Sequence, residues 1–571
     1  MKILFGYLKP QVPRMVLGFI IKFTGTIMDL FLPWILSYII DDVAPTGSIN
    51  HVIFYGILMV LCAVIAVQGN VIANRMAAKV ARDTTSALRH DLFEKISHLS
   101  CSSIDRFSVS SLEARMTTDT YNLHHLVGMA QRMGVRAPIL LIGGIGITLM
   151  MEPVLTLVLI CILPFIALIT YKVSKKGIPL YDAHQKSVDK MTGVIRENVS
   201  GIRVIKALSK MDYEKKRFEN ANNKTVECET RASVTMAISN PLINFLLNTA
   251  LAVVIFVGAY RVNGGTIGTG KIIAFLSYFT IISNAMLTVT RIFVMFSKGI
   301  NSANRISSVM NAENELDIKE IQREKTDNHI EFRNVSFSYY KKRNNVEGLN
   351  FAVKYGGSLG IIGATGSGKT TIVSLLLRLY DIDKGSIMIG GEDIRSIDPE
   401  RLHNMFGIVF QSDTLFADTI KNNIDFGRGL SDEEIERAID LSQAREFIDS
   451  LEDGKEHVLS QKGTNLSGGQ KQRILLARAL AKNPDILVLD DSSSALDFKT
   501  EAALRQALSE NKQGITTVTV AQRISSVRSS DLIIVLNGGK IEGAGKHDEL
   551  LKNCTQYGLI NALQTGGVIG G

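Results

Sequence analysis

An octapeptide past the middle of the chain, Gly363-Ala364-Thr365-Gly366-Ser367-Gly368-Lys369-Thr370, has the composition and spacing of a phosphate-binding loop. It follows the apolar run SLGIIG and precedes TIVSLLLRLY, so we expect a strand, a glycine-rich turn and a helix in that order. Glycines let backbone N–H groups close around phosphate oxygens, and the helix amino terminus adds partial positive charge. We therefore predict nucleotide binding by Gly363, Thr365, Gly366, Ser367, Gly368, Lys369, Thr370 and Thr371.

Within this loop, Lys369 is expected to reach the β and γ phosphates, and the Thr370 hydroxyl is expected to ligate Mg²⁺. Downstream, the apolar run Ile486-Leu487-Val488-Leu489 predicts a buried strand that ends in Asp490, whose carboxylate can hold the Mg²⁺ shell. The loop alone would also fit a GTPase, a kinase or a helicase, so further motifs must decide between these classes.

Four further motifs in residues 328–550 resemble those of ATP-binding cassette (ABC) proteins. Leu466-Ser467-Gly468-Gly469-Gln470 resembles the family signature, Gln411 in VFQSDTLF its Q-loop, and Ser494-Ala495-Leu496-Asp497 its D-loop. Tyr339 in VSFSYY occupies the place of the aromatic residue that stacks on adenine. The resemblance implies ATP and Mg²⁺ as cofactors, with Gln411 joining Thr370 and Asp490 at the metal. It also implies catalytic roles for Gln411, Ser467, Gly468, Gly469, Gln470 and Asp497.

Three positions depart from the family pattern. Asp491 stands where the family has the Glu that polarises the attacking water, Gln522 replaces a switch His, and Gln461 replaces a Glu before the signature. Asp is one methylene shorter than Glu, and a misplacement near 1 Å can cost on the order of 10²-fold in rate. Gln cannot carry a proton as His can. We expect the site built on this chain's own phosphate loop to bind ATP and to hydrolyse it slowly.

The composition indicates that part of the chain lies in lipid. The 571 residues are 46% hydrophobic and 21% charged, with a net charge of +8. This apolar content excludes disordered, collagen-like and coiled-coil classes. The cysteines form no CxxC pair and are odd in number, which disfavours a disulfide framework or a zinc site; they are Cys62, Cys101, Cys161, Cys228 and Cys554.

Apolar runs near the roughly 20 residues needed to span a bilayer predict six membrane helices. They lie at about 15–40, 52–72, 133–151, 154–174, 241–262 and 272–296. The loop 41–50 has no Lys or Arg, whereas 73–132 has eight and 172–235 has fourteen. Since positive charge marks cytoplasmic segments, we predict cytoplasmic amino and carboxyl termini in a bacterial cytoplasmic membrane.

No proline lies between Pro45 and Pro138 or between Pro179 and Pro241, so helices can continue beyond the predicted spans. A continuous helix over 52–100 would rise roughly 73 Å, at about 1.5 Å per residue. The hydrocarbon core is only about 30 Å thick. The surplus predicts long cytoplasmic helical hairpins that could contact a motor domain, although two ordinary cytoplasmic loops would also fit these features.

The amino-terminal half also resembles the family's fused exporters. Residues 104–119 and 197–208 look like the two cytoplasmic coupling segments, and 302–310 looks like the junction to the nucleotide-binding domain. The predicted fold is therefore a membrane α-helical domain of ABC exporter type, joined to an α/β P-loop nucleotide-binding domain. The expected boundaries are 1–304 for the six-helix domain, 305–327 for the linker and 328–571 for the nucleotide-binding domain.

Polar residues within the predicted spans are candidates for a substrate cavity. They are Lys22 and Asp29 in the first span, Asn240, Asn244 and Asn248 in the fifth, and Thr280, Asn284, Thr288 and Arg291 in the sixth. Bonds between helices or snorkelling to headgroups would also account for them. Phe31, Trp34 and Tyr38 are either substrate contacts or interface anchors.

Together these features predict an ATP-hydrolysing subunit of a multidrug-type exporter for amphipathic drugs or lipids. It would pair with a second half-transporter, because the resemblance implies that the signature of each half completes the ATP site of the other. A homodimeric lipid or peptide exporter and an ATP-gated regulatory subunit stay as alternatives. No nucleic acid partner is expected, and the six spans exclude a soluble cassette ATPase.

Overall fold

The computed structural model describes residues 2–314, 316, 318–491, 503, 506 and 514–565. Two residues singled out above are affected, since Asp497 and the side chain of Arg291 lie outside what is described. The chain forms two compact units. One comprises Met1–Ser97 and Ser110–Ala312, and the other comprises His98–Val109 and Glu313–Gly571. We call them the helical unit and the nucleotide unit.

Among its described residues, the helical unit contains six segments long and apolar enough to cross a membrane, as predicted. Its helices are α1 (Lys2–Leu8), α2 (Val12–Tyr38), α3 (Ile49–Ser97), α5 (Val109–Ala114), α6 (Thr120–Met151), α7 (Pro153–Ser200), α8 (Ile202–Ala207), α9 (Met211–Ala237), α10 (Ser239–Asn263) and α11 (Thr269–Met310). Short turns of 3₁₀ or π type lie at Lys9–Gln11 (η1), Ile39–Val43 (η2), Ala44–Thr46 (η3) and Arg115–Asp119 (η4).

Proline placement agrees with the length of α3 but does not limit α7, which runs for 48 residues with Pro164 and Pro179 inside it. Pro153 begins α7, where its missing N–H group costs nothing. No proline interrupts α3, which runs unbroken for 49 residues. At about 1.5 Å per residue this is roughly 73 Å, more than twice a bilayer core, so α3 extends well beyond its apolar run.

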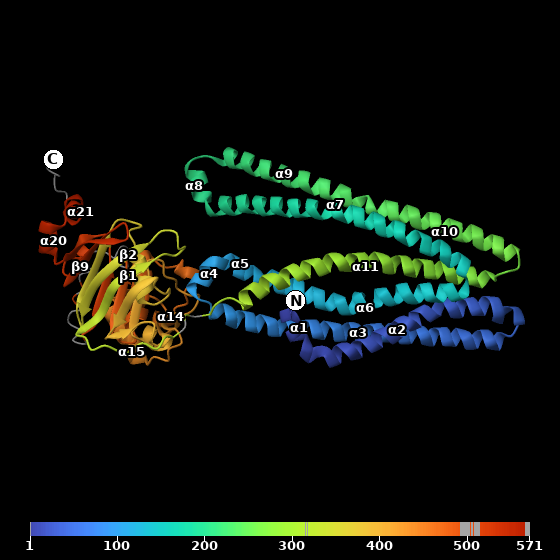
Figure 1. The fold of residues 1–571 in the computed structure, drawn as a ribbon, viewed down its shortest axis with the longest axis horizontal. Helices are drawn as coiled ribbons and strands as arrows, with labels where there is room; N and C mark the ends of the chain where they lie inside the picture. Colours follow the sequence, from blue (N-terminus) through green and yellow to red (C-terminus); the bar gives the residue numbers. More distant parts are fainter. Residues whose placement is uncertain are drawn as a thin grey trace. The chain divides into compact units, whose positions relative to one another are not determined.

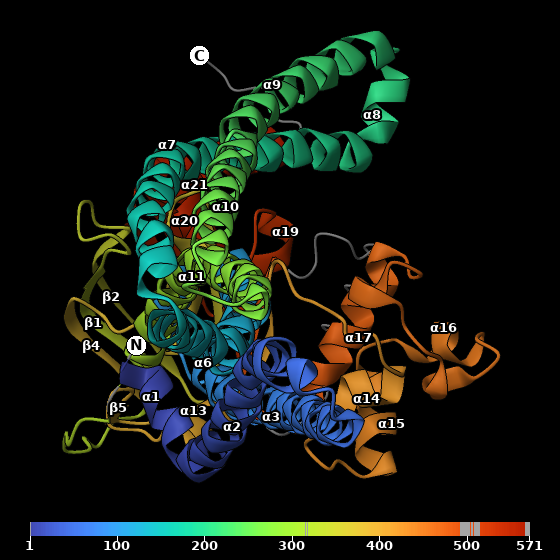
Figure 2. The ribbon, with the colours of Figure 1, turned by 90° about the vertical axis from the view of Figure 1, so that its right-hand side faces the viewer.

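Helices α7, α8, α9 and α10 form a long antiparallel arm (Figure 1). Helix α9 returns along α7, and the short α8 makes the turn. Seen along the helices, the α8 end of this arm lies away from the group formed by α2, α3 and α6 (Figure 2). The apolar side chains of Ile202, Val204 and Leu208 at this turn are exposed in the single chain.

The nucleotide unit is built on two sheets. One has the order β2-β1-β4-β5, and the other has the order β10-β9-β3-β8-β7-β6. In the second sheet β9, β3, β8, β7 and β6 are parallel, and β10 is antiparallel at the edge. The strands are β1 (Asn328–Phe337), β2 (Val346–Lys354), β3 (Ser358–Gly363), β4 (Lys384–Ile389), β5 (Glu392–Asp393), β6 (Phe406–Val409), β7 (Ile486–Asp490), β8 (Thr516–Val520), β9 (Leu532–Asn537) and β10 (Lys540–Gly545).

Helices cover these sheets and complete two apolar cores. They are α12 (Lys369–Leu376), α13 (Pro399–Asn404), α14 (Ile420–Asp425), α15 (Asp432–Leu441), α16 (Arg445–Asp449), α17 (Gly468–Leu480), α19 (Ile524–Val527), α20 (His547–Asn553) and α21 (Thr555–Thr565). One core lies between the sheets and α12, and the other surrounds α14, α15 and α17. Strand β7 is buried along its whole length, as its uninterrupted apolar sequence predicts.

Helix α4 (Cys101–Phe107) is part of the nucleotide unit rather than of the helical unit. The Tyr380 hydroxyl donates a hydrogen bond to Asp105 Oδ2 at 2.6 Å. Leu99 pairs with Asn314 in an antiparallel bridge. A short segment from the amino-terminal half of the sequence is thus bound into the nucleotide unit, beyond what the sequence indicated.

Candidate nucleotide-binding site

One cavity of about 210 Å³ in the nucleotide unit brings most of the predicted site residues together. It lies at the carboxyl ends of parallel strands, the usual place for a ligand in such sheets. Its lining comprises Asn345, Thr365, Gly366, Gly368, Lys369, Thr370, Thr371, Gln411, Asp490, Asp491, Val520 and Gln522. Residues from five separate stretches of sequence therefore face a common space.

The phosphate loop between β3 and α12 has the backbone that its glycines predict. Gly368 has a φ of +102°, and a Cβ atom there would lie 2.9 Å from Val346 Cγ1 and 3.0 Å from the Asn345 carbonyl oxygen. A side chain is thus excluded by both conformation and space. Lys369 Nζ donates hydrogen bonds of 2.9 Å to the carbonyl oxygens of Gly363 and Ala364.

Lys369 is the cationic side chain among the residues that line this cavity. Burial holds its pKa below the usual value, and the carboxylates of Asp491 and Asp490 partly offset that effect. The ammonium group remains suited to a phosphate, because anionic oxygens can replace the two carbonyl acceptors of its own loop.

Asp490 ends β7 and is almost fully buried. Burial raises the pKa of its carboxyl group, and a hydrogen bond from Thr370 opposes this rise. Oδ2 of Asp490 has no hydrogen-bond partner in the described part of the chain. A buried carboxylate oxygen left unpaired, beside a threonine hydroxyl and with Gln411 on the same cavity, is a donor set that suits Mg²⁺. The residues present therefore fit the ion that the sequence predicts.

Asp491 follows directly and adopts an unusual backbone. Its φ is +52°, in the left-handed region, and its N–H group donates to the Val520 carbonyl oxygen at 2.9 Å. Gln522 Nε2 donates a hydrogen bond to Asp491 Oδ2 at 3.0 Å. Two of the three residues that depart from the family pattern are thus direct partners, which the sequence did not indicate.

The signature residues do not line this cavity. Ser467 caps α17 and forms a capping box with Gln470, whose side chain accepts from the Ser467 N–H group at 2.9 Å. Gly468 and Gly469 form the first turn of that helix. Their N–H groups are free of earlier helical partners and carry partial positive charge.

Tyr339 lies next to the cavity without lining it. Its backbone N–H group donates to Asn345 Oδ1 at 3.2 Å, and its ring packs edge-on against Tyr380. Asn345 is a cavity residue that the sequence analysis missed, because it belongs to no recognised motif. Gln461 is exposed in the short turn Gln461–Gly463 (η6), outside the cavity.

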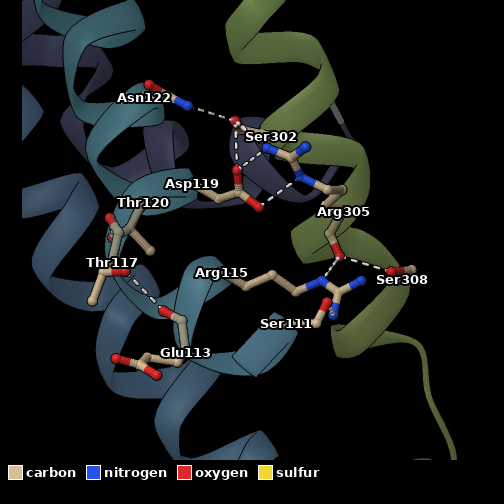
Figure 3. A network of polar contacts seen from close by, with 10 residues as sticks. All are labelled: Ser111, Glu113, Arg115, Thr117, Asp119, Thr120, Asn122, Ser302, Arg305 and Ser308. Atoms are coloured by element: carbon tan, nitrogen blue, oxygen red, sulfur yellow. Dashed lines mark hydrogen bonds and ion pairs between the residues drawn. The ribbon is translucent and has the colours of Figure 1, made fainter. Parts of the chain in front are cut away.

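In the helical unit, a polar network joins η4 and α6 to α11 (Figure 3). Asp119 is buried and pairs with Arg305, whose Nε donates to Asp119 Oδ2 at 2.8 Å. The Ser302 hydroxyl donates to Asp119 Oδ1 at 2.8 Å, and Arg115 Nε donates to the Arg305 carbonyl oxygen at 3.1 Å. These bonds fix the end of α11 against the π-type turn η4.

The predicted cavity residues of the membrane spans have different surroundings. Lys22 is buried, and Asp29 forms an ion pair with Arg136 at 2.9 Å. The predicted polar residues of the fifth and sixth spans are exposed or half-buried in the single chain; they are Asn240, Asn244, Asn248, Thr280, Asn284 and Thr288. The aromatic residues of the first span, Phe31, Trp34 and Tyr38, are also exposed or half-buried.

Comparison with known protein families assigns both halves of the chain to the ABC transporters. Residues 15–286 match the ABC transporter transmembrane region, and residues 346–494 match the ABC transporter family domain. The uncharacterized ABC transporter ATP-binding protein YfiB of Bacillus subtilis is 34% identical over 563 residues, which cover 98% of each chain. The ATP-dependent lipid A-core flippase of Pseudomonas fluorescens strain Pf0-1 is 30% identical over 98% of this chain and 95% of its own length.

A solved structure shows the same fold. It is that of a bacterial Atm1-family ABC exporter with ATP bound, with a TM-score of 0.82 and coverage of 99% of both chains. Its sequence identity is 23%, so the likeness concerns the fold.

Proposed function

The chain belongs to the ABC exporters as a half-transporter with fused transmembrane and nucleotide-binding domains, and from this premise we propose that it forms one half of a heterodimer whose own ATP site hydrolyses slowly. It is a multi-pass cell-membrane protein and an ATP-driven exporter subunit.

The observation that carries the proposal is the pair Asp491 and Gln522. An attacking water needs a carboxylate that accepts its proton and sits within hydrogen-bond reach. Here one oxygen of the shortened carboxylate already accepts the Gln522 amide at 3.0 Å. A neutral amide neither carries a proton nor supplies the positive charge that a switch imidazolium would bring. Both effects slow the chemical step and leave ATP binding intact.

In this site, the other residues of the cavity bind the nucleotide and Mg²⁺. Lys369 and the N–H groups around Gly366 and Gly368 hold the phosphates. Thr370, Gln411 and Asp490 hold Mg²⁺, which neutralises charge on the phosphate oxygens when bound. The ring of Tyr339 stacks on the adenine, and Asp497 stays a prediction from the motif alone.

The signature residues of this chain act in the other ATP site of the heterodimer. Ser467, Gly468, Gly469 and Gln470 lie at the exposed start of α17 and do not line this chain's own cavity. A partner half-transporter with an unaltered Glu and His would present its nucleotide to this helix start. The competent site of the pair would then combine the partner's catalytic residues with this chain's signature.

We further propose amphipathic drugs or lipids as the substrate and cytoplasmic chain termini. The apolar helices and the relative that flips lipid A-core support a membrane-dissolved substrate. The distribution of Lys and Arg supports the orientation. The bond between Tyr380 and Asp105 supports α4 as the segment that receives movement from the nucleotide-binding domain.

The test is the ATPase activity of the purified full-length chain, with nucleotide binding measured in parallel. The chain alone should bind Mg²⁺–ATP and show ATPase activity close to that of Asp491→Asn. The double variant Asp491→Glu with Gln522→His should gain activity. Robust hydrolysis by the chain alone that Asp491→Asn abolishes would instead support a homodimer with two working sites.

A further inference from the structure

Helix α21 reaches the segment that carries Gln522. Near the end of this helix, Gln564 donates a hydrogen bond from Nε2 to the Gln522 carbonyl oxygen at 2.8 Å. Its Oε1 accepts a hydrogen bond from the Ile524 N–H group, also at 2.8 Å. One amide side chain therefore binds two backbone groups that lie 40 or more residues away in sequence. We call residues 521–524, which follow β8, the switch segment.

The two hydrogen bonds specify the conformation of the switch segment. Arg523 lies between the two bound groups and is extended, with φ −98° and ψ +131°. The carbonyl group of Gln522 and the N–H group of Ile524 therefore point to the same side. A residue of a parallel neighbouring strand would bind the same two groups. The Gln564 amide, with one donor and one acceptor, takes the place of such a neighbour and holds the segment extended.

Helix α21 is itself firmly attached to the nucleotide unit. Tyr557 is fully buried, and its hydroxyl shares a hydrogen bond of 2.7 Å with His547 Nδ1 of α20. The apolar core around Tyr557 includes Ala521 and Ile524 of the switch segment and Ile362 of β3. The side-chain amide near the end of α21 is therefore carried on a fixed support.

The switch segment connects this support to the ATP cavity. Gln564 holds the backbone of Gln522, whereas the side chain of Gln522 lines the cavity and donates to Asp491 Oδ2 at 3.0 Å. A movement of the Gln522 backbone changes where its side chain ends. A displacement near 1 Å at a reacting centre can cost on the order of 10²-fold in rate. A contact outside the cavity can thus influence the chemistry inside it.

This contact contributes more to position than to stability. Gln564 and Gln522 are both exposed, so water can replace the hydrogen bond between them. Hydrogen bonds that water can replace contribute little net stability. Tyr557 and its apolar core hold α21 in place independently. A change at Gln564 should therefore release the switch segment while the nucleotide unit stays folded.

We propose that Gln564 is a positioning residue for ATP hydrolysis. Its amide fixes the backbone of the switch segment and so sets where the side chain at position 522 lies relative to the side chain at position 491. The inference rests on the proposed function, in which these two positions control the chemical step. It adds α21 to the elements that determine the rate, and it leaves ATP binding to the phosphate loop and the Mg²⁺ ligands.

The first measurement follows the switch segment itself in the purified full-length chain. Gln564→Met keeps the length and helix propensity of the side chain and removes both hydrogen bonds. The amide hydrogen of Ile524 should exchange at least about fivefold faster, because it loses its acceptor. Leu563→Ala changes a neighbour on α21 that is 70% exposed and should leave this exchange unaltered. Equal exchange in the two variants would overturn the inference.

The second measurement is steady-state ATPase activity, recorded in the natural sequence and in the Asp491→Glu, Gln522→His background. In whichever of the two hydrolyses ATP faster, Gln564→Met should lower kcat at least about tenfold and leave KM for ATP within about twofold. Leu563→Ala should leave kcat unchanged.

Two further variants separate the hydrogen bond from the shape of the side chain. Gln564→Lys restores a donor for the Gln522 carbonyl oxygen and should recover most of the lost kcat. Gln564→Glu places a carboxylate oxygen against that carbonyl and should recover none. Equal kcat in these two variants would overturn the inference, as would an unchanged kcat in Gln564→Met.

A purely structural role has a different signature. It would lower Tm, ATP affinity and kcat together in Gln564→Met, and that result would also overturn the inference. The proposed function fails on a separate comparison, that of the natural sequence with its Asp491→Glu, Gln522→His variant. The faster of these two still tests Gln564, so the two failures are distinguishable.

Discussion

Gln522 Nε2 donates a hydrogen bond of 3.0 Å to Asp491 Oδ2, so two of the three positions that depart from the ABC pattern are in direct contact. One is the place of the water-activating acid and the other is the place of the switch histidine. The Gln522 amide binds one oxygen of the Asp491 carboxylate, and the Asp491 side chain is one methylene shorter than the Glu of the family pattern. A change at either residue should therefore alter the other's position.

The first prediction concerns nucleotide affinity. Lys369→Ala removes the cation that lines the cavity beside Asp490 and Asp491, so this chain's own site should bind Mg²⁺–ATP at least about tenfold more weakly, as expected for loss of a charge-assisted bond. Equilibrium binding of a fluorescent ATP analogue measures this. Lys384→Ala, an exposed lysine on β4, is the matched control. Equal affinity of both variants would contradict the phosphate-loop assignment.

The second prediction concerns the attachment of α4. Tyr380→Phe removes the hydroxyl that donates to Asp105 at 2.6 Å, a bond to a charged group worth about 1.5–3 kcal/mol. Amide hydrogens of residues 101–107 should then exchange at least about tenfold faster. Hydrogen–deuterium exchange detects this directly. Tyr340→Phe changes a tyrosine that is 83% exposed and should leave the exchange of α4 unaltered. If amide hydrogens of α4 exchange at the same rate in both variants, the hydrogen bond between Tyr380 and Asp105 does not hold α4 in place.

The half-buried position of Tyr380 is consistent with this contact. Desolvation and the hydrogen bond to Asp105 both raise the pKa of the tyrosine hydroxyl. The hydroxyl therefore stays protonated, and able to donate, throughout the physiological pH range. No loss of this contact is expected between neutral and mildly alkaline pH.

The third prediction concerns the network in Figure 3. Asp119→Ala leaves Arg305 and the buried Ser302 hydroxyl without their common acceptor. Because Arg305 is 55% exposed, we expect a cost of about 2 kcal/mol rather than the full value for a buried pair. Thermal unfolding in detergent should show a lower Tm. Glu197→Gln breaks the exposed pair with Arg217 and should leave Tm unchanged. An equal effect of the two changes would mean that the network contributes little.

Much of this architecture could be predicted from local sequence. The six spans follow from apolar runs, and the phosphate loop and β7 follow from motifs a few residues long. The partners of these elements could not be predicted, because Tyr380 and Asp105 are 275 residues apart and Gln522 and Asp491 are 31 apart. The residues adjacent in sequence to each partner do not specify such long-range contacts.

The ion pair between Asp29 and Arg136 in the membrane helices illustrates the same limit. Lys22 and Asp29 stood out as ionisable residues in an apolar run, whereas Arg132 and Arg136 lie at the edge of the third apolar run and resemble ordinary flanking charges. Only the packing of α2 against α6 makes Arg136 the partner of Asp29. Asn345 was missed for a similar reason, since its place in the nucleotide cavity depends on a loop that crosses the phosphate loop.

The fourth prediction concerns orientation. After replacement of the five cysteines, Ser48→Cys should react in whole cells with a thiol reagent that does not cross membranes, because the loop 41–50 lacks Lys and Arg. Ser209→Cys lies at the turn after α8, in the basic segment 172–235, and should react only after permeabilisation. The reverse pattern would invert the topology.

The central claim is that this chain's own ATP site is the weaker one because of Asp491 and Gln522. The most direct measurement is the ATPase rate of the purified full-length chain compared with its Asp491→Glu, Gln522→His double variant, at equal nucleotide occupancy. Correct placement of a catalytic carboxylate is worth on the order of 10²-fold in rate, so the double variant should exceed the natural chain by tenfold or more. An equal or lower rate in the double variant, together with strong hydrolysis by the natural chain that Asp491→Asn abolishes, would contradict the account and make Asp491 a fully working catalytic residue.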